Sequence, residues 1–143
     1  MTGKIYDIAL AKMGTSDIYW DSGGDTFKLV LMTNSYTFNS SHETYANLTN
    51  EIGATGSYSS GGVGLTLKVT TYGGGVLYFG ADTLVLTGIT ATFRKLAIYD
   101  STVDNNLLLY IDLGEDVSLT NENYTLMWNG DAIWYGVMGG GAP

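Results

Sequence analysis

The residues that could do chemistry in this chain begin with a glycine- and serine-rich segment, GATGSYSSGGVG at residues 53–64. A phosphate-binding loop needs such glycines between a strand and a helix, together with a lysine that reaches the phosphates. Here LTLKV follows and alternates as a strand does, and no G-K-[ST] is present. A nucleophile elbow would need G-x-S-x-G before a helix. The segment therefore predicts a turn that enters a strand.

His42 is the only histidine, so any serine–histidine–acid triad would have to use it. Its nucleophile would be Ser57, Ser59 or Ser60, and nothing in the sequence places one of these next to His42. One histidine without any cysteine also cannot supply the usual tetrahedral zinc ligands. We therefore predict no catalytic residues, no bound metal, no cofactor and no enzymatic activity.

Two acidic stretches leave a calcium site open as an alternative. YIDLGED at 110–116 and DSTVD at 100–104 place carboxylates around turns, and oxygen-rich turns can bind Ca²⁺. Their spacing does not match an EF-hand loop, and aspartate is common at strand ends because it hydrogen-bonds to nearby backbone. No feature selects a pair of carboxylates for glycoside hydrolysis.

Aromatic residues are the strongest chemical signal, and those near the two ends of the chain stand beside glycines. Exposed tryptophan and tyrosine are favoured at protein interfaces and can also stack on sugars. A glycine-rich tail costs entropy to order, so we expect it to be ordered when another protein chain holds it. The predicted partner-binding residues are Tyr19, Trp20, Trp134 and Tyr135.

Composition narrows the class of partner. The 143 residues carry 6 basic against 14 acidic side chains, for a formal net charge of −8. The basic residues are scattered, whereas nucleic-acid binding needs a clustered basic face, so we expect no nucleic-acid partner. We expect no signal peptide and no membrane partner, because no basic-then-apolar start and no apolar run of about 18 residues occurs.

The elements that must position these residues are mostly strands separated by Gly, Asn and Asp turns. Alternation predicts strands at 27–33, 64–72, 76–80, 82–88, 89–100, 106–114, 124–129 and 132–137, and short helices at 4–13 and 42–52. This pattern is typical of an all-β fold, an antiparallel β-sandwich of jelly-roll type with one or two short helices. We expect a single domain over 1–143, with an N-terminal segment at 1–26 and a Gly-rich tail at 136–143.

Alternation also predicts the core. The strand at 27–33 is apolar on both faces, which indicates a position in the middle of a sheet. The expected core residues are Leu29, Leu31, Leu65, Leu67, Phe79, Leu84, Leu86, Phe93, Ile98, Leu109, Ile111, Leu126 and Trp128.

Several stretches resemble a known group of proteins when they are taken in order along the chain. They are FKLVLMTNSYTFN (27–39), NEIGATGSYSSGGVGLT (50–66), ITATFRKLAIYD (89–100), LLLYIDLGED (107–116) and NYTLMWNGDAIW (123–134). With a strand that ends in SYT and a following glycine–tyrosine segment, the chain resembles small virion proteins of tailed bacteriophages. The extra SDIYWDSGG near the start and the GVMGGGAP tail depart from that group.

The resemblance implies a structural role and carries no catalytic motif. Proteins of this group are similar in size and fold to capsid cement or decoration proteins. We therefore expect a virion protein, assembled in the host cytoplasm, that binds the major capsid protein and copies of itself as a homo-oligomer. Tail, collar and fibre-base roles stay open. A carbohydrate-binding or host-adhesion module of a tail or fibre is the alternative.

Overall fold

The computed structural model describes residues 2–20, 23–66, 68–73, 76–127 and 134–137, and for residues 2, 69–73, 76–79 and 134–137 it describes the backbone alone. The described chain is mostly β, as the sequence predicts. Its strands are β1 (Thr2–Ile5), β2 (Phe27–Met32), β3 (Val63–Gly64), β4 (Val69–Gly73), β5 (Val76–Gly80), β6 (Leu84–Asp100), β7 (Asn106–Leu126) and β8 (Trp134–Val137). The helices are α1 (Asp7–Gly14) and a single 3₁₀ turn, η1 (Tyr45–Asn47).

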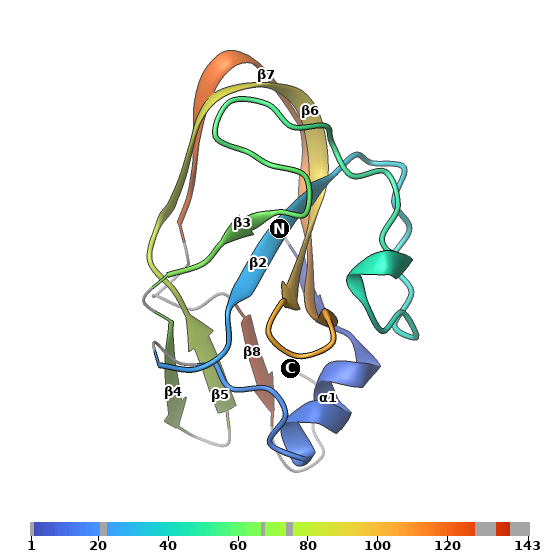
Figure 1. The fold of residues 1–143 in the computed structure, drawn as a ribbon, viewed down its shortest axis with the longest axis vertical. Coiled ribbons are helices and arrows are strands. Elements are labelled where there is room, and N and C mark those ends of the chain that lie inside the picture. The colour runs from blue at the N-terminus through green and yellow to red at the C-terminus, as the bar shows by residue number, and fades with distance from the viewer. Residues whose placement is uncertain (1, 21–22, 67, 74–75, 128–133, 138–143) are drawn as a thin grey trace.

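The strands form two antiparallel sheets. The larger has the order β1-β7-β6-β2-β3, and the smaller has the order β4-β5-β8. Figure 1 shows the smaller sheet at the lower end of the molecule, near the start of β6. The all-β class with short helices is confirmed, and the face-to-face packing of a jelly-roll sandwich stays a prediction.

Strand β2 lies inside the larger sheet, as its two apolar faces predict, between β6 and the two-residue edge strand β3. One of its faces contributes Phe27, Leu29 and Leu31 to the main core cluster. Its other face contributes Val30 and Met32 to a second cluster rich in tyrosine. A strand buried on both faces reads as a continuous apolar run rather than as an alternation.

The predicted core is largely confirmed. The buried members are Leu29, Leu31, Leu65, Leu86, Phe93, Ile98, Leu109, Ile111 and Leu126, and Leu84 is partly buried against them. Leu67 and Trp128 lie outside the described residues, as does the side chain of Phe79. Alternation along strands is sufficient to identify these positions because it depends only on the pleat.

The long hairpin of β6 and β7 differs from the sequence prediction, which divided each strand into two. Gly88, expected in a turn, has φ +63° and lies inside β6, where the pairing with β7 shifts register between Leu86 and Ile89. Gly114 has φ +93° and lies inside β7 in the same way. A glycine within a strand marks a bulge as readily as a turn, and only the neighbouring strand decides between them.

The bulges let the hairpin curl around its own core. In a straight strand Leu86 and Ile98 would lie about 40 Å apart. They nevertheless belong to the same cluster of buried residues, and Figure 1 shows β6 and β7 arching together over the top of the molecule. One hairpin therefore supplies much of the wall that encloses the core.

The two helices predicted at residues 4–13 and 42–52 are only partly present. Residues 2–5 form β1, which pairs with β7, and the helix starts only at Asp7. The expected helix over 42–52 shrinks to η1, because the segment lies extended against β7, with Leu107 N–H donating to the Glu43 carbonyl at 2.8 Å. In both places pairing with β7 overrides the local helical spacing. No helix in the described part of the chain has the length and apolar character needed to cross a membrane.

Candidate functional site

Tyr19 is exposed on a backbone that is held in place. Its side chain is 56% exposed in the connection between α1 and β2. The Tyr19 N–H donates to Asp25 Oδ2, and the Asp25 N–H donates to the Tyr19 carbonyl, both at 2.9 Å. A Cβ atom on Gly24 would overlap that carbonyl and the Tyr19 ring, so the turn needs glycine there. Tyr19 is thus exposed, and its role in binding a partner stays a prediction.

Trp20 is a core residue, which corrects the prediction that it is displayed for a partner. Only 4% of it is exposed, and its ring lies 4.6 Å from that of Phe27, centroid to centroid. Its indole Nε1–H donates to the Gly80 carbonyl at 2.9 Å. An indole can be buried when its single donor finds an acceptor, and the acceptor here comes from a strand that is 60 residues away in sequence.

The other two predicted residues lie in β8. Trp134 pairs with Phe79 and Tyr135 pairs with Tyr78 on β5, and the side chains of all four lie outside the described part of the structure. Gly136 and Val137 of the predicted tail continue this pairing within the same chain, and residues 138–143 lie outside the described residues. Since Gly80 directly follows Phe79, the structure brings both predicted terminal segments to the end of β5.

An exposed apolar pair that the sequence reading missed lies close to this place. Val85 is 50% exposed and Met127 is 69% exposed. Val85 pairs with Thr125, so Met127 is its diagonal neighbour on the same face of the hairpin. Val85 is five residues from Gly80 and therefore within about 18 Å of it. Alternation in LVLTG pointed to Val85, because the core positions Leu84 and Leu86 flank it. We call Tyr19, Val85, Met127 and strand β8 the docking face.

Asp25, which is hydrogen-bonded to Tyr19, has a buried carboxyl as its neighbour. Asp100, the last residue of β6, is fully buried, and its Oδ1 accepts hydrogen bonds from the N–H groups of Thr102 and Val103 at 2.9 and 3.2 Å. Burial, and next a hydrogen bond with the neighbouring Asp25 carboxyl, raise the pKa of Asp100 to about 7. With both carboxyls ionised, Asp100 Oδ2 has no donor. A proton on one of them supplies the hydrogen bond that joins the pair.

His42 and Ser57, one of the candidate serines, belong to separate hydrogen-bond networks. His42 is half-buried, with Nδ1 3.0 Å from the Tyr36 hydroxyl, which in turn lies 2.8 Å from that of Tyr6. Burial, followed by the Tyr36 hydrogen bond, strongly raises the pKa of Tyr6. Ser57 Oγ instead accepts the N–H of Thr87 at 2.9 Å. His42 and Ser57 are therefore not joined in a triad.

The Gly-Ser segment is an irregular connection over residues 53–62, as predicted, with one isolated bridge between Thr55 and Tyr58. Glu51 holds it in place, because its carboxylate accepts hydrogen bonds from the Tyr45 hydroxyl, the Tyr58 hydroxyl and the Gly61 N–H. The Glu51 hydrogen bond, together with burial, raises the pKa of Tyr45 to about 12. The segment therefore has a structural anchor that its sequence did not reveal.

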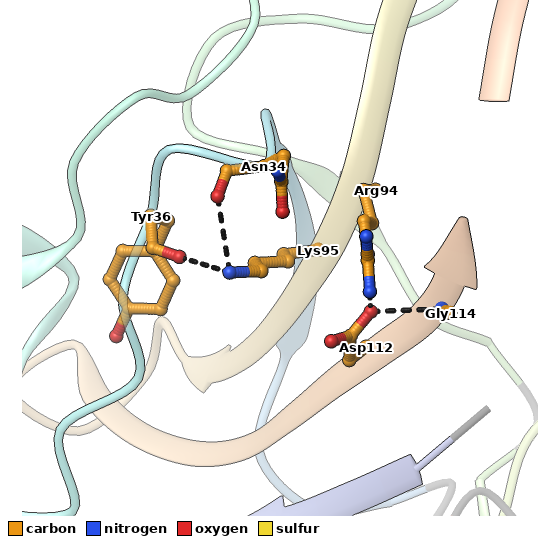
Figure 2. A network of polar contacts seen from close by, with 6 residues as sticks. All are labelled: Asn34, Tyr36, Arg94, Lys95, Asp112 and Gly114. Atoms are coloured by element: carbon orange, nitrogen blue, oxygen red, sulfur yellow. Dashed lines mark hydrogen bonds and ion pairs between the residues drawn. The ribbon is translucent and has the colours of Figure 1, made fainter. Parts of the chain in front are cut away.

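The two adjacent basic residues point to opposite sides of β6, as strand geometry predicts (Figure 2). Arg94 Nε donates to Asp112 Oδ1 at 2.9 Å, and the Gly114 N–H donates to the same oxygen at 2.8 Å. Lys95 Nζ donates to the carbonyls of Asn34 and Tyr36.

These contacts bear on the acidic stretch at 110–116. Hydrogen bonds from Arg94 and Gly114 lower the pKa of Asp112 and occupy its Oδ1. Among the described residues, no group of three or more His, Cys, Asp or Glu side chains could hold a metal ion. The structure thus gives no support to a calcium site around Asp112.

The chain matches no protein-family model, no curated protein and no solved structure. Function is therefore inferred from the residues and their arrangement.

Proposed function

We propose that this chain is a structural protein of a tailed-bacteriophage virion, of the capsid cement or decoration type. In this role it binds the assembled lattice of the major capsid protein through the docking face and stabilises the head. Copies of the chain associate with one another on that lattice. It acts by adhesion and performs no catalysis.

The observation that carries the proposal is the exposed apolar character of the docking face. Tyr19, Val85 and Met127 are three of the four large apolar side chains that are strongly exposed among those described. The backbone of Val85 is held by strand pairing, that of Tyr19 by paired hydrogen bonds, and Met127 directly follows the last paired residue of β7. We infer that these side chains together form a surface that another protein covers, because exposed apolar groups that gather on one face mark interaction sites.

Energetics fit a protein that works in many copies. Burying one large apolar side chain contributes about 1.5–3 kcal/mol, and association costs at least about 4 kcal/mol in lost freedom of motion. Three such residues therefore give weak binding for a single copy. Copies that also touch one another on a lattice are held much more tightly, because each contact raises the effective concentration for the next.

A carbohydrate-binding module has less support. It would need two or three coplanar exposed aromatics, and Tyr19 is the one strongly exposed aromatic among the side chains that the structure describes. A titration of the tryptophan fluorescence with soluble sugars tests this alternative directly. A saturable change would favour the sugar-binding function over capsid binding.

The direct test is co-production of the chain with the major capsid protein of its own phage, followed by sedimentation of the particles. We expect the native chain to sediment with the particles and the triple variant Tyr19→Ser, Val85→Ser, Met127→Ser to be bound at least about tenfold less. The matched control is Leu10→Ser, because Leu10 is 55% exposed but lies on α1. Equal occupancy of the triple variant, shown by circular dichroism to be folded, would contradict the docking face. Absence of the native chain from the particles would contradict the capsid role.

A further inference from the structure

The Gly-Ser segment (residues 53–62) bonds to the backbone of β6 through its side-chain hydroxyls. Ser57 Oγ accepts the Thr87 N–H and Thr55 Oγ1 accepts the Thr90 N–H, both at 2.9 Å. The Ser57 N–H in turn donates to the Thr87 carbonyl at 3.0 Å. Backbone groups of a strand that lack a neighbouring strand need other partners, and here the hydroxyls stand where a neighbouring strand would present carbonyls.

The segment covers a stretch of β6 that has a strand neighbour on one side alone. Strand β2 pairs with β6 from Lys95 to Asp100. Over residues 84–94, β7 is the one strand that pairs with β6 in the described part of the chain. The segment also covers β2, since the Tyr58 hydroxyl accepts the Leu31 N–H at 3.1 Å. The Gly-Ser segment therefore lies over the free edges of two strands.

The covered edge is without charge, whereas the uncovered edge of the same hairpin is acidic. Residues 84–93 read LVLTGITATF, without any Lys, Arg, Asp or Glu. Beyond its pairing with β1, β7 has no strand neighbour on its outer side among the described residues, and this part contains the exposed acids Glu115, Asp116 and Glu122. A free edge of neutral, β-forming residues favours pairing with a copy of the same chain, and charges on an edge oppose it. The hairpin therefore needs a cover on β6 more than on β7.

One carboxylate, that of Glu51, holds the segment against the sheet. It accepts hydrogen bonds from the Tyr58 hydroxyl at 2.7 Å and from the Gly61 N–H at 2.8 Å, and its second oxygen accepts the Tyr45 hydroxyl. The hydroxyl that covers Leu31 is thus fixed by a charged acceptor, and hydrogen bonds to charged groups are the stronger ones. Loss of the Glu51 carboxylate should therefore loosen the segment along its length.

We propose that the Gly-Ser segment acts as a strap that masks a pairing site on β6, and that β6 of a second copy of the chain occupies this site when the strap is released. Two copies related by a two-fold axis can place the same edge antiparallel to itself, because such pairing uses backbone groups and meets no like charges over residues 84–93. The closed strap prevents association through β6. This inference goes beyond the proposed capsid-binding function and does not depend on it.

Hydrogen exchange in the full chain tests whether Glu51 holds the strap closed. In Glu51→Ala, the amides of Thr87 and Thr90 should exchange at least about tenfold faster than in the native chain, because the strap is open for a larger fraction of the time. Asp112→Ala is the matched control, since it also removes a partly buried carboxylate that accepts two hydrogen bonds, and it should leave both rates nearly unchanged. Equal rates in Glu51→Ala and the native chain would overturn the role of Glu51.

Self-association, measured by light scattering after size exclusion, tests whether the strap masks a pairing site. Glu51→Ala should associate at concentrations at least about tenfold lower than the native chain, because apparent affinity scales with the fraction of molecules in the open state. Tyr58→Phe, which keeps the ring and loses the hydroxyl, should shift association in the same direction and replaces Glu51→Ala if that variant does not fold. Asp112→Ala should associate as the native chain does.

A lysine on β6 shows where the copies meet. Thr92 is exposed on the uncharged stretch of β6, and Thr120 is exposed on β7. Added to Glu51→Ala, Thr92→Lys should restore native behaviour, because a charge on a free edge opposes pairing, whereas Thr120→Lys should not. Faster exchange without increased association, or equal effects of the two lysines, would overturn the proposal.

Discussion

At the scale of single residues, the protonation of Asp100 makes the stability of the fold depend on pH. Its pKa, raised to about 7 by burial and by Asp25, exceeds the ordinary value of 3.8 that applies in the unfolded chain. Between about pH 4 and pH 7 the carboxyl of Asp100 is therefore protonated in the folded state and ionised in the unfolded state. A raised pKa of this kind contributes stability that is full below pH 4 and is lost as the pH rises through 7.

We therefore expect the free energy of unfolding, measured in urea, to fall by a few kcal/mol between pH 5 and pH 8. In Asp100→Asn this fall should largely disappear. The carboxyls of Asp17 and Asp112 have lowered pKa values, so their contributions are lost only at acid pH and do not interfere in this window. Parallel pH profiles for the native chain and the variant would show that the pair does not hold the proton.

Trp20 and Tyr19 are adjacent in sequence, but their substitution should have very different effects on the free energy of unfolding. Trp20→Ser removes a buried ring and the hydrogen bond to Gly80, so we expect a loss of about 3–5 kcal/mol in the free energy of unfolding. Tyr19→Ser changes an exposed ring and should cost less than about 1 kcal/mol. Trp20→Phe should lie between them, since it keeps most of the packing. Urea unfolding measures all three, and similar losses for Trp20→Ser and Tyr19→Ser would show that the indole is not a core group.

At the scale of elements, the Gly-Ser segment packs closely against the β6–β7 hairpin at two glycines. Gly56 has φ +52°, and a Cβ atom there would overlap the carbonyls of Thr87 and Gly88. Gly88 has φ +63°, but a Cβ atom there meets only ordinary contacts at 3.6 Å and beyond. The two positions share the backbone conformation and differ in the space around it.

This difference makes a matched pair of variants. Gly88→Ala should cost about 1–2 kcal/mol, the penalty of a left-handed conformation for an L-residue. Gly56→Ala should cost clearly more, because the segment must also move away from β6 and lose the bonds between Ser57 and Thr87. Chemical denaturation of both variants compares them. A larger loss for Gly88→Ala would mean that the segment does not pack on the hairpin as described.

At the scale of the whole molecule, the terminal segments remain the predicted contact with another chain. Deleting residues 138–143 leaves β8 intact, so we expect the truncated chain to fold with an unchanged Tm. If a neighbouring subunit holds the tail, occupancy on sedimented particles should fall. Deletion of residues 136–143, which also removes half of β8, should lower Tm as well. Undiminished occupancy of both folded truncations would exclude the tail as an anchor.

The sequence alone determined the features that depend on local alternation. It predicted the all-β class, the interior position of β2 in its sheet and most of the buried residues, because the pleat sends successive side chains to opposite faces whatever their partners are. It also predicted an irregular connection at residues 53–62, since glycine and serine favour turns over strands. Strand alternation likewise implies that the neighbours Arg94 and Lys95 point to opposite faces.

Only the tertiary structure decided what depends on partners distant in sequence. Whether Gly88 forms a turn or a bulge depends on the path of β7, and whether residues 2–5 form a helix or a strand depends on an open edge of the sheet. Trp20 is buried because Gly80 offers its indole an acceptor. Asp100 holds a proton at neutral pH because the fold encloses it beside Asp25. Register, burial and electrostatic environment arise from the packing of distant segments, which a local pattern does not encode.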